Sequence, residues 1–225
     1  MERVLVIHNS YQQYGGEDSV VKMESALLAE KGNLVGKYVV SNDAISGVWG
    51  KFSAALGVVF SLSVYVKVRM LLKEVKPDIV HVHNFFPLLS PSVFYACHAE
   101  GIPVVLTLHN YRIICPTALL MWQEQITERS LKNGPWWALR HRVYRGSLLG
   151  TLALCFMISL HRSIGTWNRK VDRYITLTEF GRGRFVDAGL PYQKISVKPN
   201  FIDAPSPTHG GEGARRGFLF VGRLS

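Results

Sequence analysis

Cysteine is scarce in this sequence, and no apolar run is long enough to span a membrane. The three cysteines, Cys97, Cys115 and Cys155, lie far apart and match no metal-binding or disulfide spacing, so we expect reduced thiols. The longest apolar stretch, 147–160, is shorter than the ~20 residues that cross a bilayer. The first residues lead directly into a strand pattern, without the small-residue cleavage site of a signal peptide. We therefore expect a cytoplasmic protein, peripheral on the inner face of the membrane if it binds one.

Acidic residues are also few. The chain has 16 Asp and Glu against 26 Lys and Arg, and the net charge of +10 favours an anionic partner, such as a nucleic acid, a nucleotide phosphate or an anionic membrane. The basic residues are scattered and do not form a stripe interleaved with aromatic residues, so we expect no nucleic-acid partner.

Several catalytic motifs are missing as well. The sequence has no GxGxxG, no P-loop lysine and no GxSxG, which argues against a dinucleotide-binding fingerprint, a Walker-type site and an α/β-hydrolase. It also has no Asp-x-Asp, the carboxylate pair that commonly holds a metal ion beside a sugar nucleotide. We therefore expect neither a metal nor a bound cofactor.

The pattern that is present indicates an α/β protein. The 225 residues are 48% hydrophobic, which is enough for a substantial core. Runs rich in Val and Ile at 78–83 and 103–109 are separated by a helix-length stretch and read as buried parallel strands. The further strands that we expect are at 4–9, 34–41, 173–178 and 195–199. The expected helical regions are 18–31, 48–75, 91–100, 135–169 and 179–188.

The domain boundaries follow from composition. We expect one domain over 1–202, then a linker rich in Pro, Gly and Ser over 203–217. Residues 218–225 read as the first strand of a second domain that the chain does not complete.

Polar residues gather where the two central strands end. One run ends in His83-Asn84, and the other in His109-Asn110 with Arg112 close behind. Ligands of open α/β sheets bind beyond the carboxyl ends of the strands, so these residues predict a small-molecule site. A histidine there can hydrogen-bond a sugar hydroxyl or exchange a proton. The alternative for His109 is a residue that ties down its own loop.

Two further segments have a functional and a structural interpretation. Gly15-Gly16, between a strand and a helix, can admit a phosphate at the helix N-terminus, or can form a plain turn capped by Glu17 and Asp18. The basic residues Arg140, Arg142 and Arg145 follow two tryptophans and precede an apolar stretch that we expect to be helical. They suit a membrane surface or a lipid-linked acceptor, or else form a solvated face above a core helix.

Together these motifs resemble the N-terminal domain of the retaining family 4 glycosyltransferases. The resemblance lies in the two histidine-ended strands with their flanks at 76–84 and 101–112. Smaller matches continue it at 8–9, 15–17, 176–180, 198–200 and 221–225.

The resemblance implies the N-terminal half of a GT-B enzyme: a Rossmann-like parallel β-sheet with helices on both faces, facing a second such domain. It implies that Gly15, Gly16 and Arg223 bind the donor diphosphate and that His109 contacts the transferred sugar. It implies a nucleotide-sugar donor and no metal, since cationic side chains and helix dipoles stabilise the leaving diphosphate.

We therefore expect an acceptor-side domain that helps transfer a hexose-type sugar, with retention, to a lipid-linked or polysaccharide acceptor. His83, Asn84, Asn110 and Arg112 are candidates on the substrate or acceptor side. The apolar stretch 52–65 and the arginines 140, 142 and 145 are candidates for contact with the membrane or lipid. Without the second domain this chain alone would be inactive. The alternative is a truncated, non-catalytic module that only binds an acceptor.

Overall fold

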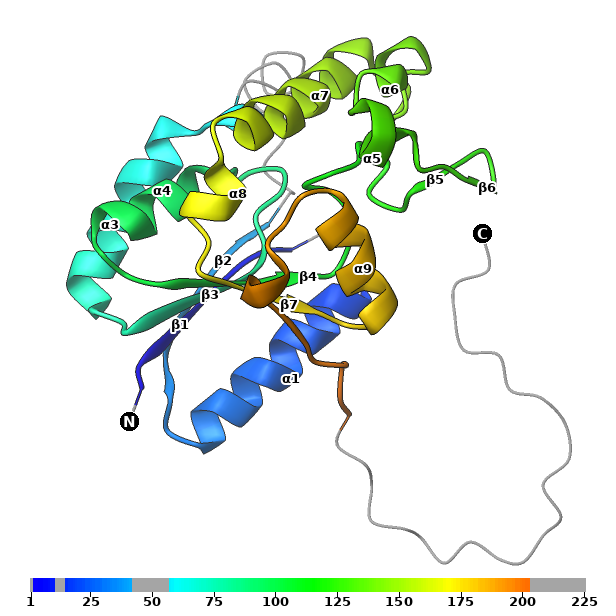
Figure 1. Ribbon diagram of the computed structural model, residues 1–225. Helices are drawn as coiled ribbons and strands as arrows, with labels where there is room; N and C mark the ends of the chain where they lie inside the picture. The colour runs from blue at the N-terminus through cyan, green and yellow to red at the C-terminus, as the bar shows by residue number, and fades with distance from the viewer. Residues whose placement is uncertain (1, 11–14, 42–56, 203–225) are drawn as a thin grey trace, which may run out of the picture.

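A computed structural model describes residues 2–10, 15–41 and 57–202 of the chain. Its main feature is a six-stranded sheet in the order β2-β1-β3-β4-β7-β8, in which every pair of neighbours is parallel. Helices cover both faces of this sheet: α1 lies on one side, and α3, α4, α7, α8 and α9 lie on the other (Figure 1). This confirms the predicted Rossmann-like α/β architecture.

The strands form where the sequence predicts them. Their bounds are β1 Val4–Ser10, β2 Leu34–Ser41, β3 Ile79–Asn84, β4 Val104–Leu108, β7 Arg173–Thr176 and β8 Ile195–Val197. β1 and β3 are buried along almost their whole length because helices cover both of their faces, which explains their continuous apolar character. β7 is two residues shorter than predicted, because the side chain of Thr178 accepts a hydrogen bond from the Gly181 backbone N–H and caps the next helix.

The helices also follow the predicted order, with one region wrong in detail. Their bounds are α1 Gly16–Glu30, α3 Leu62–Val75, α4 Ser92–Ala99, α5 Arg129–Asn133, α6 Trp137–Arg140, α7 Leu148–Ser163, α8 Thr166–Arg169 and α9 Glu179–Asp187, with a 3₁₀ turn at Tyr192–Lys194. The long helical region predicted over 135–169 is divided into α6, α7 and α8. Gly146 and Gly165, with φ of 66° and 70°, adopt the left-handed conformation at the two breaks.

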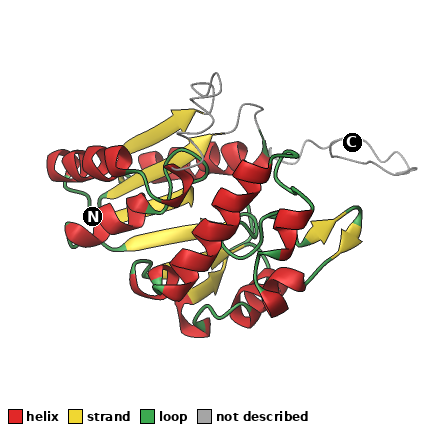
Figure 2. Ribbon diagram, turned by 90° about the horizontal axis from the view of Figure 1, so that it is seen from above, coloured by secondary structure: helices red, strands yellow, loops and turns green. Residues whose placement is uncertain are grey.

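The connection between β4 and β7 is the part of the fold that the sequence predicts least completely. It carries α5 to α8 and a hairpin made of β5 Met121–Trp122 and β6 Gln125–Ile126. Figure 2 shows the hairpin projecting beyond the helices at one end of the molecule. Its strands are two residues long, too short for a periodic pattern in the sequence.

Three predictions fall outside the described residues. These are the first part of the predicted helical region 48–75, of which the structure describes residue 57 onward, the linker 203–217 and the strand 218–225 with Arg223. They stay predictions.

Candidate functional site

The strand order creates a switch point at the carboxyl edge of the sheet. β2 lies on one side of β1, and β3 lies on the other. The connections that leave the adjacent strands β1 and β3 therefore run in opposite directions along the sheet. Ligands of doubly wound sheets bind in the crevice beyond such a point. His8 and His83 belong to the two strands that flank it, and His109 follows the neighbouring strand β4.

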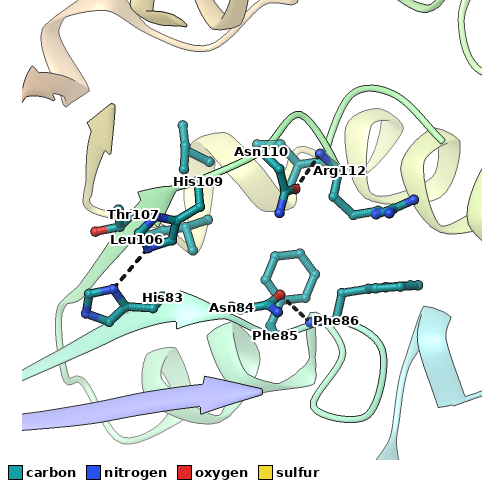
Figure 3. Close-up of a pocket in the computed structure, with 11 residues that line it drawn as sticks. His83, Asn84, Phe85, Phe86, Leu106, Thr107, His109, Asn110 and Arg112 are labelled. Carbon is teal, nitrogen blue, oxygen red and sulfur yellow. Dashed lines mark hydrogen bonds between the residues drawn. The ribbon is translucent and has the colours of Figure 1, made fainter. Parts of the chain in front are cut away.

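The asparagine after each histidine shapes the turn that follows. The Asn84 side-chain oxygen accepts the Phe86 N–H at 3.0 Å, and the Asn110 side-chain oxygen accepts the Arg112 N–H at 3.0 Å (Figure 3). Both are side-chain-to-backbone turns of the Asx type. The Asn84 amide also donates to the Asn9 carbonyl at 2.9 Å and so ties the ends of β3 and β1 together. The repeated His-Asn ending is therefore a turn that presents a histidine at the sheet edge.

The two candidate histidines are in direct contact. Nδ1 of His83 and Nε2 of His109 are 3.1 Å apart, and their ring planes differ by 19° (Figure 3). His81 lies beside them, with its ring 4.1 Å from that of His83 and its Nε2 2.8 Å from the Thr107 hydroxyl. This buried bond joins β3 to β4 and gives His81 a structural role.

Burial keeps these histidines neutral. Desolvation lowers the pKa of His81 to about 4, with a further contribution from the Lys198 charge. Desolvation also lowers the pKa of His109 to about 4, helped by the charges of His8, His81 and Lys198. The pKa of His83 is lowered for the same first reason, reinforced by the surrounding imidazoles. At neutral pH each ring therefore carries one proton and can both donate and accept a hydrogen bond.

The glycine loop lies next to His109. Glu17, directly after Gly15-Gly16, accepts a 2.8 Å hydrogen bond from the side chain of Asn110. Asp18 accepts the Gly15 N–H at 2.8 Å and lies 3.0 Å from Nε2 of His8. The interpretation of this segment as a capped turn is therefore supported, because Asp18 caps the start of α1. The contact of Glu17 with Asn110 brings the same loop to the histidine edge.

The backbone of this loop does not itself require glycine. Gly15 has φ −127° and ψ −179°, an extended conformation open to any residue. A Cβ atom added at Gly16 would meet no atom of the described chain within 4 Å. The space beside Gly16 is therefore open at the N-terminus of a 15-residue helix, whose dipole favours an anion.

Arg112 connects the histidine edge to a larger pocket. Its guanidinium donates to the Pro116 carbonyl and lies 4.8 Å from the ring centre of Phe86 and 5.7 Å from that of Tyr144. The small pocket at His83 and His109 has a volume of about 20 Å³, enough for a water molecule. Arg112 also lines a pocket of about 330 Å³ against the β5–β6 hairpin. A bulky ligand therefore fits beside the hairpin and not beneath the histidines.

The predicted basic group is on the surface. Arg140, Arg142 and Arg145 are all exposed. In the adjoining helix α7, Leu154, Met157 and Ile158 are buried in the core, as the structural interpretation of this segment requires. The opposite face of α7 is also apolar, with Leu148, Leu152 and Phe156 exposed by 51%, 41% and 49%. Among the described residues, no helix has the length and apolar character needed to traverse a bilayer.

One group of side chains has the composition of a metal site. Glu24, His81 and His83 each offer a ligand atom, and these atoms lie within 4.8 Å of one another. Two imidazoles and a carboxylate suit Zn²⁺. Lys198, however, donates to the other carboxylate oxygen of Glu24, and its ammonium group would repel a second cation. The donor set therefore does not favour a metal ion, and the expected absence of one stays a prediction.

Glu24 and Lys198 were not singled out as site residues from the sequence. Glu24 lies on α1 among the apolar positions Val20 and Val21, and all three are buried. A carboxylate on the buried face of an amphipathic helix is a signal that could have found it. Lys198 follows β8, and nothing in the sequence indicates that it reaches α1.

Comparison with protein families decides which family is present. The model of glycosyltransferase family 4 matches residues 42–205, well over half of the chain. The chain belongs to glycosyltransferase family 4. The resemblance noted in the sequence is thereby confirmed at the level of the family. No curated protein matches the chain.

Comparison with solved structures finds similar chains, and one of them reaches the similarity of a shared fold. The Anabaena protein Alr3699/HepE, in complex with UDP and glucose, is 13% identical, with a TM-score of 0.50 over 90% of this chain and 45% of that chain. The UDP-N-acetylglucosamine 2-epimerase of Rickettsia bellii is 14% identical, with a TM-score of 0.49 over 89% and 45% of the two chains. The lipopolysaccharide outer core galactosyltransferase WaaB is 13% identical, with a TM-score of 0.44 over 87% and 44%. The chain thus spans less than half the length of these structures.

Proposed function

We propose that this chain is the acceptor-side part of an enzyme that transfers a sugar from a nucleotide-sugar donor, with retention of configuration. The observation that carries the proposal is the contact between the glycine loop and the histidine edge in a member of glycosyltransferase family 4. Asn110 holds Glu17 at 2.8 Å, so an anion at the start of α1 and a sugar at His109 would be neighbours. A sugar diphosphate has this arrangement of charge and hydroxyl groups.

The roles of the residues follow from their surroundings. Gly16 lets a phosphate approach the N–H groups of α1, and His109 contacts the transferred sugar. Asn84 and Asn110 stabilise the turns that follow β3 and β4, because the side-chain oxygen of each accepts a backbone N–H two residues further on. Arg223 of the predicted second domain would bind the diphosphate, and we expect transfer to require that domain. We expect no metal ion to take part, because cationic side chains and helix dipoles would stabilise the leaving diphosphate.

The acceptor is proposed to be lipid-linked or a polysaccharide. The pocket of about 330 Å³ beside the hairpin is lined by apolar and polar groups and borders Arg112, next to the histidine edge. The exposed apolar face of α7, with Arg140, Arg142 and Arg145 near its start, suits an anionic membrane in which a lipid-linked acceptor resides.

Activity of the full-length protein with His109→Ala tests the proposal. We expect loss of sugar transfer with an unchanged circular dichroism spectrum, because the ring lies at the edge and not within the apolar core. His98→Ala is the matched control, since His98 is exposed on α4 and is expected to leave transfer intact. Near-normal transfer by His109→Ala would refute the role of His109. Release of an epimerised sugar nucleotide, with no acceptor product, would refute the proposed reaction. Acceptor binding without any turnover of donor would favour the non-catalytic module.

A further inference from the structure

Glu24 lies behind the histidine edge, where it faces the candidate residue His83. Its Oε2 is 3.6 Å from Nε2 of His83 and 3.8 Å from Nδ1 of His81, and its Oε1 pairs with Lys198. The Glu24 side chain is 9% exposed and the His83 side chain 0%. The buried carboxylate thus faces one ring nitrogen of each imidazole. The other ring nitrogen of His81 contacts the Thr107 hydroxyl, and that of His83 contacts His109.

His83 links this carboxylate to His109. Its Nδ1 lies 3.1 Å from Nε2 of His109, and both rings are neutral at pH 7 because burial lowers the pKa of each. A hydrogen bond between two neutral imidazoles needs one N–H and one lone pair, so only two proton arrangements are possible. In the first, His83 carries its proton on Nε2 and accepts from His109. In the second, His83 carries its proton on Nδ1 and donates to His109.

The carboxylate distinguishes these two arrangements. In the first, the N–H of His83 points toward the negative Oε2 of Glu24, which is attractive. In the second, a lone pair points toward that oxygen at 3.6 Å, which is repulsive. Nε2 of His83 is buried and has no hydrogen-bond partner among the described residues, and Oε2 of Glu24 is the acidic oxygen that faces it. The nearby His8, with its ring 6.5 Å from that of His83, is itself paired with Asp18 and does not compete.

We propose that Glu24 fixes the tautomer of His109 through His83, so that Nδ1 of His109 is a hydrogen-bond acceptor. Glu24 and His83 are then positioning residues, and His109 accepts a hydrogen bond from a hydroxyl group of the bound sugar. The identity of the ligand rests on the proposed function, whereas the tautomer does not. A carboxylate on α1 thereby determines that the edge presents a lone pair and not an N–H.

Nitrogen NMR of the ligand-free chain, labelled with ¹⁵N in histidine, measures the tautomer directly. A ring nitrogen with a lone pair resonates well apart from one that carries a proton. We expect the lone-pair signal at Nδ1 of His109 and at Nδ1 of His83, with the protonated signal at Nε2 of both. His109→Gln and His83→Gln assign the signals. A protonated Nδ1 in His109 of the unmodified chain overturns the proposal, whether or not any variant folds.

Glu24→Gln tests the cause. Glutamine keeps the shape but removes the charge and can donate to His83, so the lone-pair signal at Nδ1 of His109 is expected to weaken while the signal of the alternative tautomer appears. Glu30→Gln is the matched control: it removes the same charge from the same helix at a residue that is 67% exposed and pairs only with Lys31 among the described residues. An unchanged His109 spectrum in folded Glu24→Gln would overturn the role of Glu24. The expected spectra in a protein that transfers no sugar would leave this inference standing and refute the proposed function.

Discussion

Replacing Gly16 with alanine separates the needs of the fold from the needs of the ligand. Gly16 opens α1, and a Cβ there meets no atom of the described residues within 4 Å. In a helix interior alanine is more favourable than glycine by about 1 kcal/mol. For a domain of this size 1 kcal/mol corresponds to about 2–4 °C in Tm, and at the helix start we expect part of that gain. The variant is therefore expected to be at least as stable as the natural chain.

The same methyl group would occupy the space that we assign to the donor phosphate. Loss of one hydrogen bond to a charged phosphate costs about 1.5–3 kcal/mol, which is roughly a 10- to 150-fold weaker affinity. Calorimetric titration of the full-length protein with nucleotide diphosphate measures this, and thermal denaturation measures stability. Gly183→Ala is the matched control, because Gly183 is also helical, in α9, with nothing within 4 Å of an added Cβ. It should gain stability and bind normally. Unchanged nucleotide affinity in Gly16→Ala would refute our reading of the glycine loop.

Two other predictions concern acid and membranes. Because the folded-state pKa of His81 and of His109 is lowered to about 4, the unfolded chain binds protons first as the pH falls below 6.5. The free energy of unfolding should then fall between pH 6.5 and 4 by at most about 1.4 kcal/mol per pH unit for each such histidine. Chemical denaturation at several pH values measures this, and a flat profile would contradict the burial of these rings. On α7, the double change Leu152→Glu and Phe156→Glu should abolish sedimentation with anionic vesicles while the chain stays folded. As a control, a charge change at exposed Lys132 should leave sedimentation with these vesicles intact. Persistent sedimentation of the double variant would exclude α7 as the membrane contact.

Much of the fold could be predicted because its elements are signalled locally. The buried strands β1, β3 and β4 are short apolar runs ended by polar residues, and α1 and α4 end near Gly32 and Gly101, both with positive φ. The proximity of the candidate residues could be predicted for a related reason, since residues that follow parallel strands must share one edge. His83 and His109 were therefore expected near each other, although their direct contact was not.

The rest could not be predicted because it depends on tertiary contacts. The division of 135–169 into separate helices depends on how each piece packs, and its apolar content alone did not reveal the breaks. The Lys198–Glu24 pair joins positions 174 residues apart, and neither residue carries a local pattern that names its partner. The proton arrangement that we propose for His83 and His109 depends on the carboxylate of Glu24 beside His83, a tertiary contact that no local motif indicates.

The long connection from β4 to β7 is structurally separate from most of the polar cluster at the sheet edge. The polar cluster is assembled from β1, α1, β3 and the tip of β4, together with a single lysine after β8. Among the described residues, this connection borders the cluster through Arg112 and through the contact of Tyr144 with Phe86. Changes in that connection would therefore alter the neighbouring pocket, which we propose to hold the acceptor, while the contacts among the histidines stay the same. Relatives that differ in specificity should accordingly diverge most between residues 111 and 170.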